Sequence, residues 1–378
     1  MASLAASGIV STPDNQHQGR RAYHALDAWR GVASLWVVLY HASLSLPVLF
    51  PMRPIHSPAW VQGGYLGVPL FFVISGYCIA NAAISAARRD QAAHSFFMAR
   101  LRRIYPPYLF VLLLSVVVSR LLPHFQDAFS LAPLFFASSL TLTQVPLHQA
   151  LAQSVFWTLN FEVGFYVCVG ALLFLPPPLR TPRTILNMLH ALTLFATALL
   201  IFLPKAPGFP LSFWTQFGLG VLAFDILRHP LARFPRLALL VTGIGLVVFA
   251  LTHRYGNEFV LAAPPMRIGF FVSLGFALLL IALYKFDKQA ESLPLARFFA
   301  WLGGFSYSLY LVHPLAIGAV LHVARALGLS FKSAAFCVVT EVVVSLICAR
   351  VLFLCCERPF LSLSKPKSGL PKAGLKCV

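Results

Sequence analysis

Long apolar runs recur along almost the whole chain, and this pattern limits the fold more than any other feature. Runs of about 17 to 25 residues match the thickness of the hydrocarbon core of a bilayer. Of the 378 residues, 59% are hydrophobic and only 11% are charged, with a mean hydropathy of +0.79, which is too apolar for one soluble domain. The sequence therefore predicts an all-α, polytopic membrane bundle of about ten transmembrane helices. The expected helices are 28–50, 63–85, 104–122, 154–175, 184–203, 209–227, 236–252, 264–284, 298–322 and 332–355.

One further apolar run, Leu131–Thr143, is too short to span a bilayer, so we expect a short re-entrant or interfacial segment there. If this run does not cross, 22 of the 29 Lys and Arg residues fall on one side of the membrane. Because basic residues concentrate in cytoplasmic loops, this distribution predicts a multi-pass cell-membrane protein with both termini in the cytoplasm.

The net charge of +18 is spread over short connections between the apolar runs. This arrangement indicates membrane orientation and contact with anionic lipid headgroups rather than binding to nucleic acid. No polar stretch is long enough to fold separately. We therefore expect a cytoplasmic N-terminal tail (1–25), one membrane domain (26–360) and a basic cytoplasmic C-terminal tail (361–378).

The first apolar run contains two residues that a bilayer rarely tolerates, Arg30 and His41. Eleven residues return to nearly the same face of a helix, about 16 Å further along its axis. The spacing predicts an arginine near one membrane surface beneath a buried imidazole. Such a pair suits an anion clamp at the mouth of a channel and a proton acceptor inside it.

Four ionisable side chains, His41, Glu162, His313 and Glu341, fall at similar depths in four different predicted helices. Intramembrane carboxylates are costly, so a functional layer is favoured over residues that only satisfy one another in packing. A His beside a carboxylate is the minimal general-base unit. The same layer would also serve as the proton relay of a transporter or flippase, and a non-catalytic scaffold is a third alternative.

Arg100 and Arg103 follow the second predicted helix and lie three residues apart, which places them on one face if this region is helical. Two adjacent guanidinium groups suit a ligand rich in phosphate. An ordinary cytoplasmic anchor explains them equally well from spacing alone.

The segment Phe305–Pro314 places hydroxyl groups and a histidine directly before a proline. Pro314 frees a backbone carbonyl, so we expect a kink that lets a substrate approach His313. Asp27 and Asp225 fall at predicted helix ends, where we expect them to be solvated. The remaining histidines show no spacing typical of a metal site, and we predict none.

The motifs, taken in order, resemble the membrane-bound acyltransferase 3 family, whose members include O-acetyltransferases of envelope polysaccharides and nodulation factors. The resemblance covers Leu26–Phe360. It rests on Leu26–Gly31 followed by His41, on Gly67–Tyr77, on Arg100 with Arg103, on Trp157–Tyr166, on Ser306–Pro314 and on Glu357–Pro359.

The resemblance implies an integral membrane O-acyltransferase. No cofactor is expected, and acyl-CoA, commonly acetyl-CoA, would be the cytoplasmic co-substrate; the acceptor would be a hydroxyl of a cell-envelope carbohydrate, glycolipid or exopolysaccharide. We expect His41 to act as the general base, Glu162 to orient or charge its imidazole, and His313 to be catalytic as well. Arg30, Arg100 and Arg103 are expected to bind the acyl donor. A covalent acyl-histidine is an open variant. The expected substrate-binding residues are Ser306, Tyr307, Tyr310 and Glu341.

Two departures from the family pattern are visible. The chain ends soon after the last apolar run, so we expect no fused SGNH domain. The first outer connection, Pro51–Gln62, contains no acidic residue, although family members often carry one near there.

Overall fold

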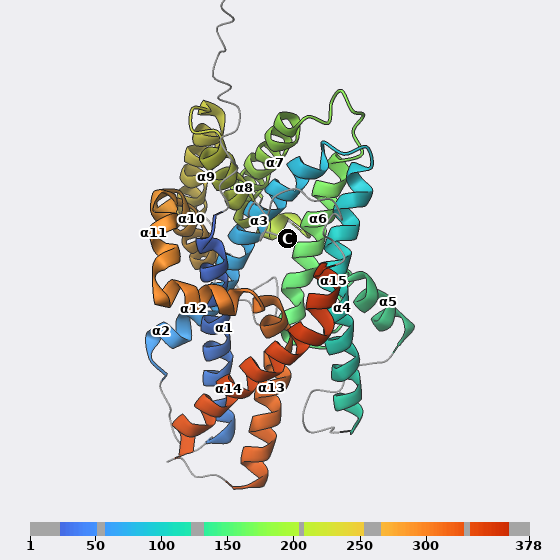
Figure 1. The fold of residues 1–378 in the computed structure, drawn as a ribbon, viewed down its shortest axis with the longest axis vertical. Coiled ribbons are helices and arrows are strands. Elements are labelled where there is room, and N and C mark those ends of the chain that lie inside the picture. The colour runs from blue at the N-terminus through green and yellow to red at the C-terminus, as the bar shows by residue number, and fades with distance from the viewer. Residues whose placement is uncertain are drawn as a thin grey trace, which may run out of the picture.

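The structure, a computed structural model, describes residues 23–50, 57–121, 132–203, 208–252, 266–328 and 333–362. All regular structure in these ranges is helical (Figure 1). Nine helical segments of this part of the chain are long and apolar enough to cross a membrane. The prediction of an all-α, multi-pass membrane protein is therefore confirmed. The predicted tails, 1–25 and 361–378, lie almost entirely outside the described residues.

Ten longer helices form the bundle: α1 (Ala25–Leu49), α3 (Gly67–Ala86), α4 (Ala92–Leu121), α6 (Trp157–Leu172), α7 (Pro182–Phe202), α8 (Trp214–Arg228), α9 (Arg233–Thr252), α10 (Met266–Leu283), α13 (Ser306–Ala326) and α14 (Ala334–Leu352). Between them lie α2 (Ala59–Gln62), α5 (Pro133–Thr141), α11 (Asp287–Ser292), α12 (Pro294–Gly303), α15 (Arg358–Ser362), the 3₁₀ turns η1 (Gly63–Leu66), η2 (Ser154–Phe156), η3 (Leu211–Phe213) and η4 (Tyr284–Phe286), and the π turn η6 (Phe353–Glu357). Helices α13 and α14 pack together at one end of the molecule, whereas α7 to α10 gather at the other (Figure 1).

Three helices differ from the sequence prediction. Helix α4 begins at Ala92, so the arginine segment is part of the helix and not a connection. The predicted helix 298–322 is two helices, α12 and α13, because the chain turns at Gly303, Gly304 and Phe305. The predicted crossing 209–227 is α8, which has 15 residues, nearly all of them buried by other helices. As expected, α5 is too short to span.

Two pairs of helices approach so closely that only glycine fits between them. A Cβ atom on Gly76 of α3 would overlap the carbonyl oxygen of Phe217, and one on Gly220 of α8 would overlap that of Val73. Gly31 of α1 and the last residue of α12 are related in the same reciprocal way. Small residues allow membrane helices to pack backbone to backbone, and these contacts fix the positions of α1 and α3.

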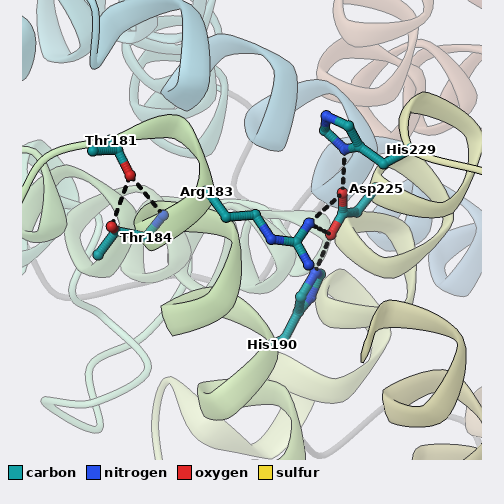
Figure 2. Close-up of polar contacts among 6 residues, drawn as sticks. All are labelled: Thr181, Arg183, Thr184, His190, Asp225 and His229. Carbon is teal, nitrogen blue, oxygen red and sulfur yellow. Dashed lines mark hydrogen bonds and ion pairs between the residues drawn. The ribbon is translucent and has the colours of Figure 1, made fainter. Parts of the chain in front are cut away.

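Asp225 is fully buried at the end of α8. The expectation that it is solvated is therefore wrong. Figure 2 shows its carboxylate held from three sides. The Nη1 atom of Arg183 lies 3.1 Å from one carboxylate oxygen and His190 Nε2 lies 2.8 Å from the same atom. His229 Nδ1 lies 2.6 Å from the other oxygen. A buried carboxylate is tolerated when it is paired in this way, so the cluster joins α7 to α8.

We expect Gly220→Ala to destabilise the protein by about 1–3 kcal/mol, because the added methyl group meets a backbone oxygen that cannot move independently. Gly275→Ala is the matched control, since a Cβ atom there meets nothing within 4 Å. The measurement is the melting temperature of the purified protein in detergent. Equal melting temperatures for the two variants would contradict the close approach of α3 and α8.

Replacing Asp225 by Ala should destabilise the protein by about 3–5 kcal/mol, because half-buried Arg183 and buried His190 lose the carboxylate that they share. Asp225→Asn keeps the shape and should cost less. Thermal denaturation of both variants, followed by loss of the monodisperse peak in size-exclusion chromatography, gives the ranking. A fully stable Asp225→Ala protein would show that the cluster is dispensable.

Candidate active site

A cavity lies where α1, α3, α4, α6 and α13 meet. Along α3, its wall is apolar at Val68, Phe71 and Phe72 and becomes polar further along the helix, at Ser75 and Cys78. The other residues of the wall are Arg30, Ile79, Arg100, Arg103, Ile104, Thr158, Leu159, Glu162, Tyr166, Ser306, Tyr307 and Tyr310. On α3 the lining runs from Val68 to Ile79, which is about 16 Å along the helix.

All three predicted donor-binding arginines line this cavity. Arg30 is 8% exposed; its Nη1 lies 3.2 Å from Asp27 Oδ1 and its Nη2 lies 3.3 Å from Cys78 Sγ. Arg100 is 7% exposed and lies over the rings of Phe96 and Tyr166. Its buried Nε atom has no hydrogen-bond partner among the residues that the structure describes. An unsatisfied buried guanidinium atom beside a cavity fits an anionic ligand.

Glu162 faces the same cavity from α6. Its Oε1 atom accepts a hydrogen bond from Ser75 Oγ at 2.9 Å and another from the hydroxyl of Tyr166. Among the described residues, these bonds hold Glu162 on the side of the arginines, and none joins it to His41.

The predicted substrate-binding residues of α13 also line the cavity. The hydroxyl of Tyr307 donates to the carbonyl of Ile104 at 3.0 Å, which ties α13 to α4 directly after Arg103. The hydroxyl of Tyr310 is 2.9 Å from Thr158 Oγ1 and 3.1 Å from a backbone carbonyl of η2. Ser306 Oγ donates to the last carbonyl of α12 at 2.9 Å. Three of the four residues expected to bind the acceptor thus share a cavity with the arginines.

His41 and His313 form a pair just beyond the cavity. Their rings lie 4.9 Å apart, with His313 Nε2 3.3 Å from His41 Nδ1. Tyr310, which belongs to the cavity wall, has its ring 5.9 Å from that of His313. The side chain of Tyr310 therefore connects the cavity wall to the histidine pair.

Backbone carbonyls define which ring nitrogens carry protons. His41 Nδ1 lies 2.9 Å from the carbonyl of Val37, and His313 Nδ1 lies 3.1 Å from that of Leu309. A carbonyl oxygen only accepts, so both Nδ1 atoms are the donors in the neutral rings. His313 Nε2 is then an acceptor toward His41. The Nε2 atom of His41 has no hydrogen-bond partner in the described part of the chain and keeps a free lone pair.

Glu341 lies outside the cavity, between α14 and α1. Its Oε2 atom is 3.0 Å from Ser45 Oγ, and its Oε1 atom is buried without a partner. The four ionisable residues expected in one layer are thus in three places: His41 with His313, Glu162 among the arginines, and Glu341 beside Ser45.

Several residues of the site were missed by sequence reasoning. Ser75 and Tyr166 bind Glu162, and Cys78 contacts Arg30. Glu357, in the π turn, is 3% exposed and accepts a hydrogen bond of 2.6 Å from Ser308 Oγ. The sequence held a signal for two of them, because residues four apart lie on the same face of a helix. Tyr166 is four residues after Glu162, and Ser75 is four residues before Ile79. Glu357 follows a long apolar run, where an acidic residue is unusual.

Comparison with known proteins assigns the chain to a family. Residues 23–355 match the acyltransferase 3 family, described as an acyltransferase domain. This match covers most of the chain, and the protein belongs to that family. It is therefore an acyltransferase of the multi-pass membrane type. The transporter and scaffold alternatives receive no support from this relationship.

Among similar proteins is the exopolysaccharide production protein ExoZ of Rhizobium meliloti, which is 27% identical over 329 residues, or 79% of this chain and 90% of that protein. The peptidoglycan O-acetyltransferase OatA of Listeria monocytogenes is 24% identical over 206 residues, covering 54% of this chain and 28% of OatA. The O-acetyltransferase OatA of Staphylococcus aureus is 27% identical over 47% of this chain and 29% of its own length. No solved structure was found to match the chain.

Proposed function

We propose that this protein is an O-acyltransferase that moves an acyl group, acetyl in the simplest case, from cytoplasmic acyl-CoA to a hydroxyl of a cell-envelope carbohydrate. The names of its relatives support acetyl transfer to an exopolysaccharide or to peptidoglycan. The observation that carries the proposal is the cavity with arginines at one end and, connected to its wall by the side chain of Tyr310, a pair of histidines.

The arginine end of the cavity suits the phosphates of the donor. Arg30, Arg100 and Arg103 present three guanidinium groups, and planar guanidinium groups bind phosphate oxygens in pairs. The pantetheine arm would run along α3 toward Phe71, past Ser75 and Glu162, whose carboxylate can accept a hydrogen bond from an amide N–H. The thioester would then lie near Tyr310.

His41 is the general base in this scheme. Its free Nε2 atom takes the proton of the acceptor hydroxyl as the oxygen attacks the thioester carbonyl. The carbon–sulfur bond breaks, and the leaving thiolate recovers the proton from His41. His313 accepts a hydrogen bond from His41 Nδ1 through its Nε2 atom, and so favours the imidazolium that forms in between. Because the Tyr310 side chain connects the cavity wall to the histidine pair, its ring has to turn aside during transfer.

The roles of the two carboxylates follow from their surroundings. Glu162 was expected to orient His41, but its bonds to Ser75 and Tyr166 favour a role in holding the donor. Glu341 is hydrogen-bonded to Ser45, which lies one helical turn after His41 on α1. This position favours a role for Glu341 on the acceptor side.

The proposed topology has both termini in the cytoplasm, with one membrane domain between two tails. It requires an even number of crossings, so α8 counts as a crossing in addition to the nine longer segments. The basic end of the cavity then opens on the side that contains acyl-CoA.

The double variant Arg100→Ala/Arg103→Ala should bind acetyl-CoA at least tenfold more weakly, because the phosphates lose two charged partners. The matched control is Arg88→Ala/Arg102→Ala, which removes the same charge from residues outside the cavity wall. Equilibrium binding of radiolabelled acetyl-CoA to the purified proteins measures the difference. Equal loss in both double variants would reduce the arginines to general membrane anchors.

His41→Ala should lower acyl transfer by about a hundredfold or more while acetyl-CoA binding stays unchanged, because a base and not a binding group is removed. His94→Ala, at an exposed position of α4, is the control. The assay follows CoA release and labelled acetate in surface glycans. Substantial transfer by His41→Ala would rule out His41 as the base, and proton-coupled flux without CoA release would favour a transporter.

A further inference from the structure

An aromatic cluster that is not part of the cavity wall lies next to the histidine pair. The ring of Tyr40 is 5.2 Å from that of His41 and 5.7 Å from that of Tyr65. Both tyrosines are half-buried, and neither hydroxyl has a hydrogen-bond partner among the described residues. With the free Nε2 of His41, three polar groups without a protein partner therefore gather at one place.

The backbone of this region lies beside the middle of α1. The 3₁₀ turn η1, which carries Tyr65, packs on the middle of α1: a Cβ atom on Gly64 would overlap the carbonyl oxygen of Trp36. Helix α1 continues from Tyr40 to Leu49, about 13 Å further. The turn thus lies within the length of α1 and not at its end.

The hydroxyls of Tyr40 and Tyr65 and the Nε2 atom of His41 have no partner among the described residues, and each would be costly against hydrocarbon. A polar ligand at this place would satisfy all three groups. Beyond them, Trp60 is 61% exposed and is tied to α1 by a hydrogen bond of 2.6 Å from Trp36 Nε1 to its carbonyl.

We propose that Tyr40, Tyr65 and Trp60 form the binding site for the carbohydrate acceptor. A sugar ring has apolar C–H faces that pack on aromatic rings and a rim of hydroxyls that bond to polar groups, which is what tyrosine and tryptophan side chains offer together. An acceptor held there presents a hydroxyl to the free nitrogen of His41. This inference rests on the proposed function and adds a location for the acceptor.

The site also separates the two substrates. Ser306, Tyr307 and Tyr310 line the donor cavity, whereas Tyr40 contacts His41, Tyr65 contacts Tyr40, and neither of these two belongs to the cavity wall. The histidine pair then lies between donor and acceptor, which is the geometry that direct transfer requires.

The test uses cells that lack the native copy and express each full-length variant. Acetate released by mild alkali from surface glycans should fall about fivefold or more in Tyr65→Ala and Trp60→Ala. It should fall about two- to fivefold in Tyr40→Phe and Tyr65→Phe, which lose only a hydroxyl. Purified variants should bind radiolabelled acetyl-CoA and release CoA without acceptor at wild-type levels, within about twofold.

Phe202→Ala removes an aromatic ring that is 80% exposed elsewhere on the bundle and is the control for a general interfacial role of aromatics. The acceptor site is ruled out if the tyrosine and tryptophan variants keep full glycan acetate, if the control loses as much, or if Tyr65→Phe loses acetyl-CoA binding. A wild-type protein that neither binds acetyl-CoA nor releases CoA would instead rule out the proposed function itself.

Discussion

The cost of burying guanidinium groups inside an apolar bundle governs this structure. Arg30 and Arg100 are each more than nine-tenths buried, and a charge in such a place is stable only when other groups replace its hydration. Asp27 meets part of this cost for Arg30, and two aromatic faces meet part of it for Arg100. The Nε of Arg100 remains unsatisfied beside the cavity. This buried N–H group can still donate a hydrogen bond, and a polyanionic ligand in the cavity would accept it.

The position of the buried arginines depends on how tightly the surrounding helices pack. Gly31 follows Arg30 directly, and its lack of a side chain lets α12 lie against the backbone of α1. Gly76 directly follows Ser75 and lies two residues before Cys78, and both of these residues line the cavity. The contact of α3 with α8 at Gly76 therefore also fixes this part of the cavity wall. Close backbone contacts of this kind do not repack gradually, because no side chain can adjust. Arg30 is therefore held in place by the glycine that follows it on α1, and Gly76 fixes the α3 side of the cavity that the arginines line.

The sequence predicted the class of fold well because the length of an apolar run is set by the bilayer. It also grouped Arg30, Arg100 and Arg103, and all three line one cavity. It failed where the outcome depends on tertiary contacts. Asp225 looked like a solvated helix end, yet three partners from α7 and the end of α8 bury it. The break between α12 and α13 had a local signal in Gly303 and Gly304, but apolar residues on both sides concealed it.

The pairing within the histidine site could not be read from depth alone. Equal depth is compatible with any neighbour around the bundle axis, so the expectation that Glu162 contacts His41 could not be checked against His313 from the sequence. The structure places His313 there and leaves Glu162 among the arginines. Two neutral imidazoles cost less to bury than an imidazole with a carboxylate, because neither carries a fixed charge in the resting state. In the mechanism that we propose, positive charge arises on His41 only when a hydroxyl gives up its proton, and it disappears when the thiolate leaves. A base of this kind would keep the interior of the bundle neutral except during the reaction.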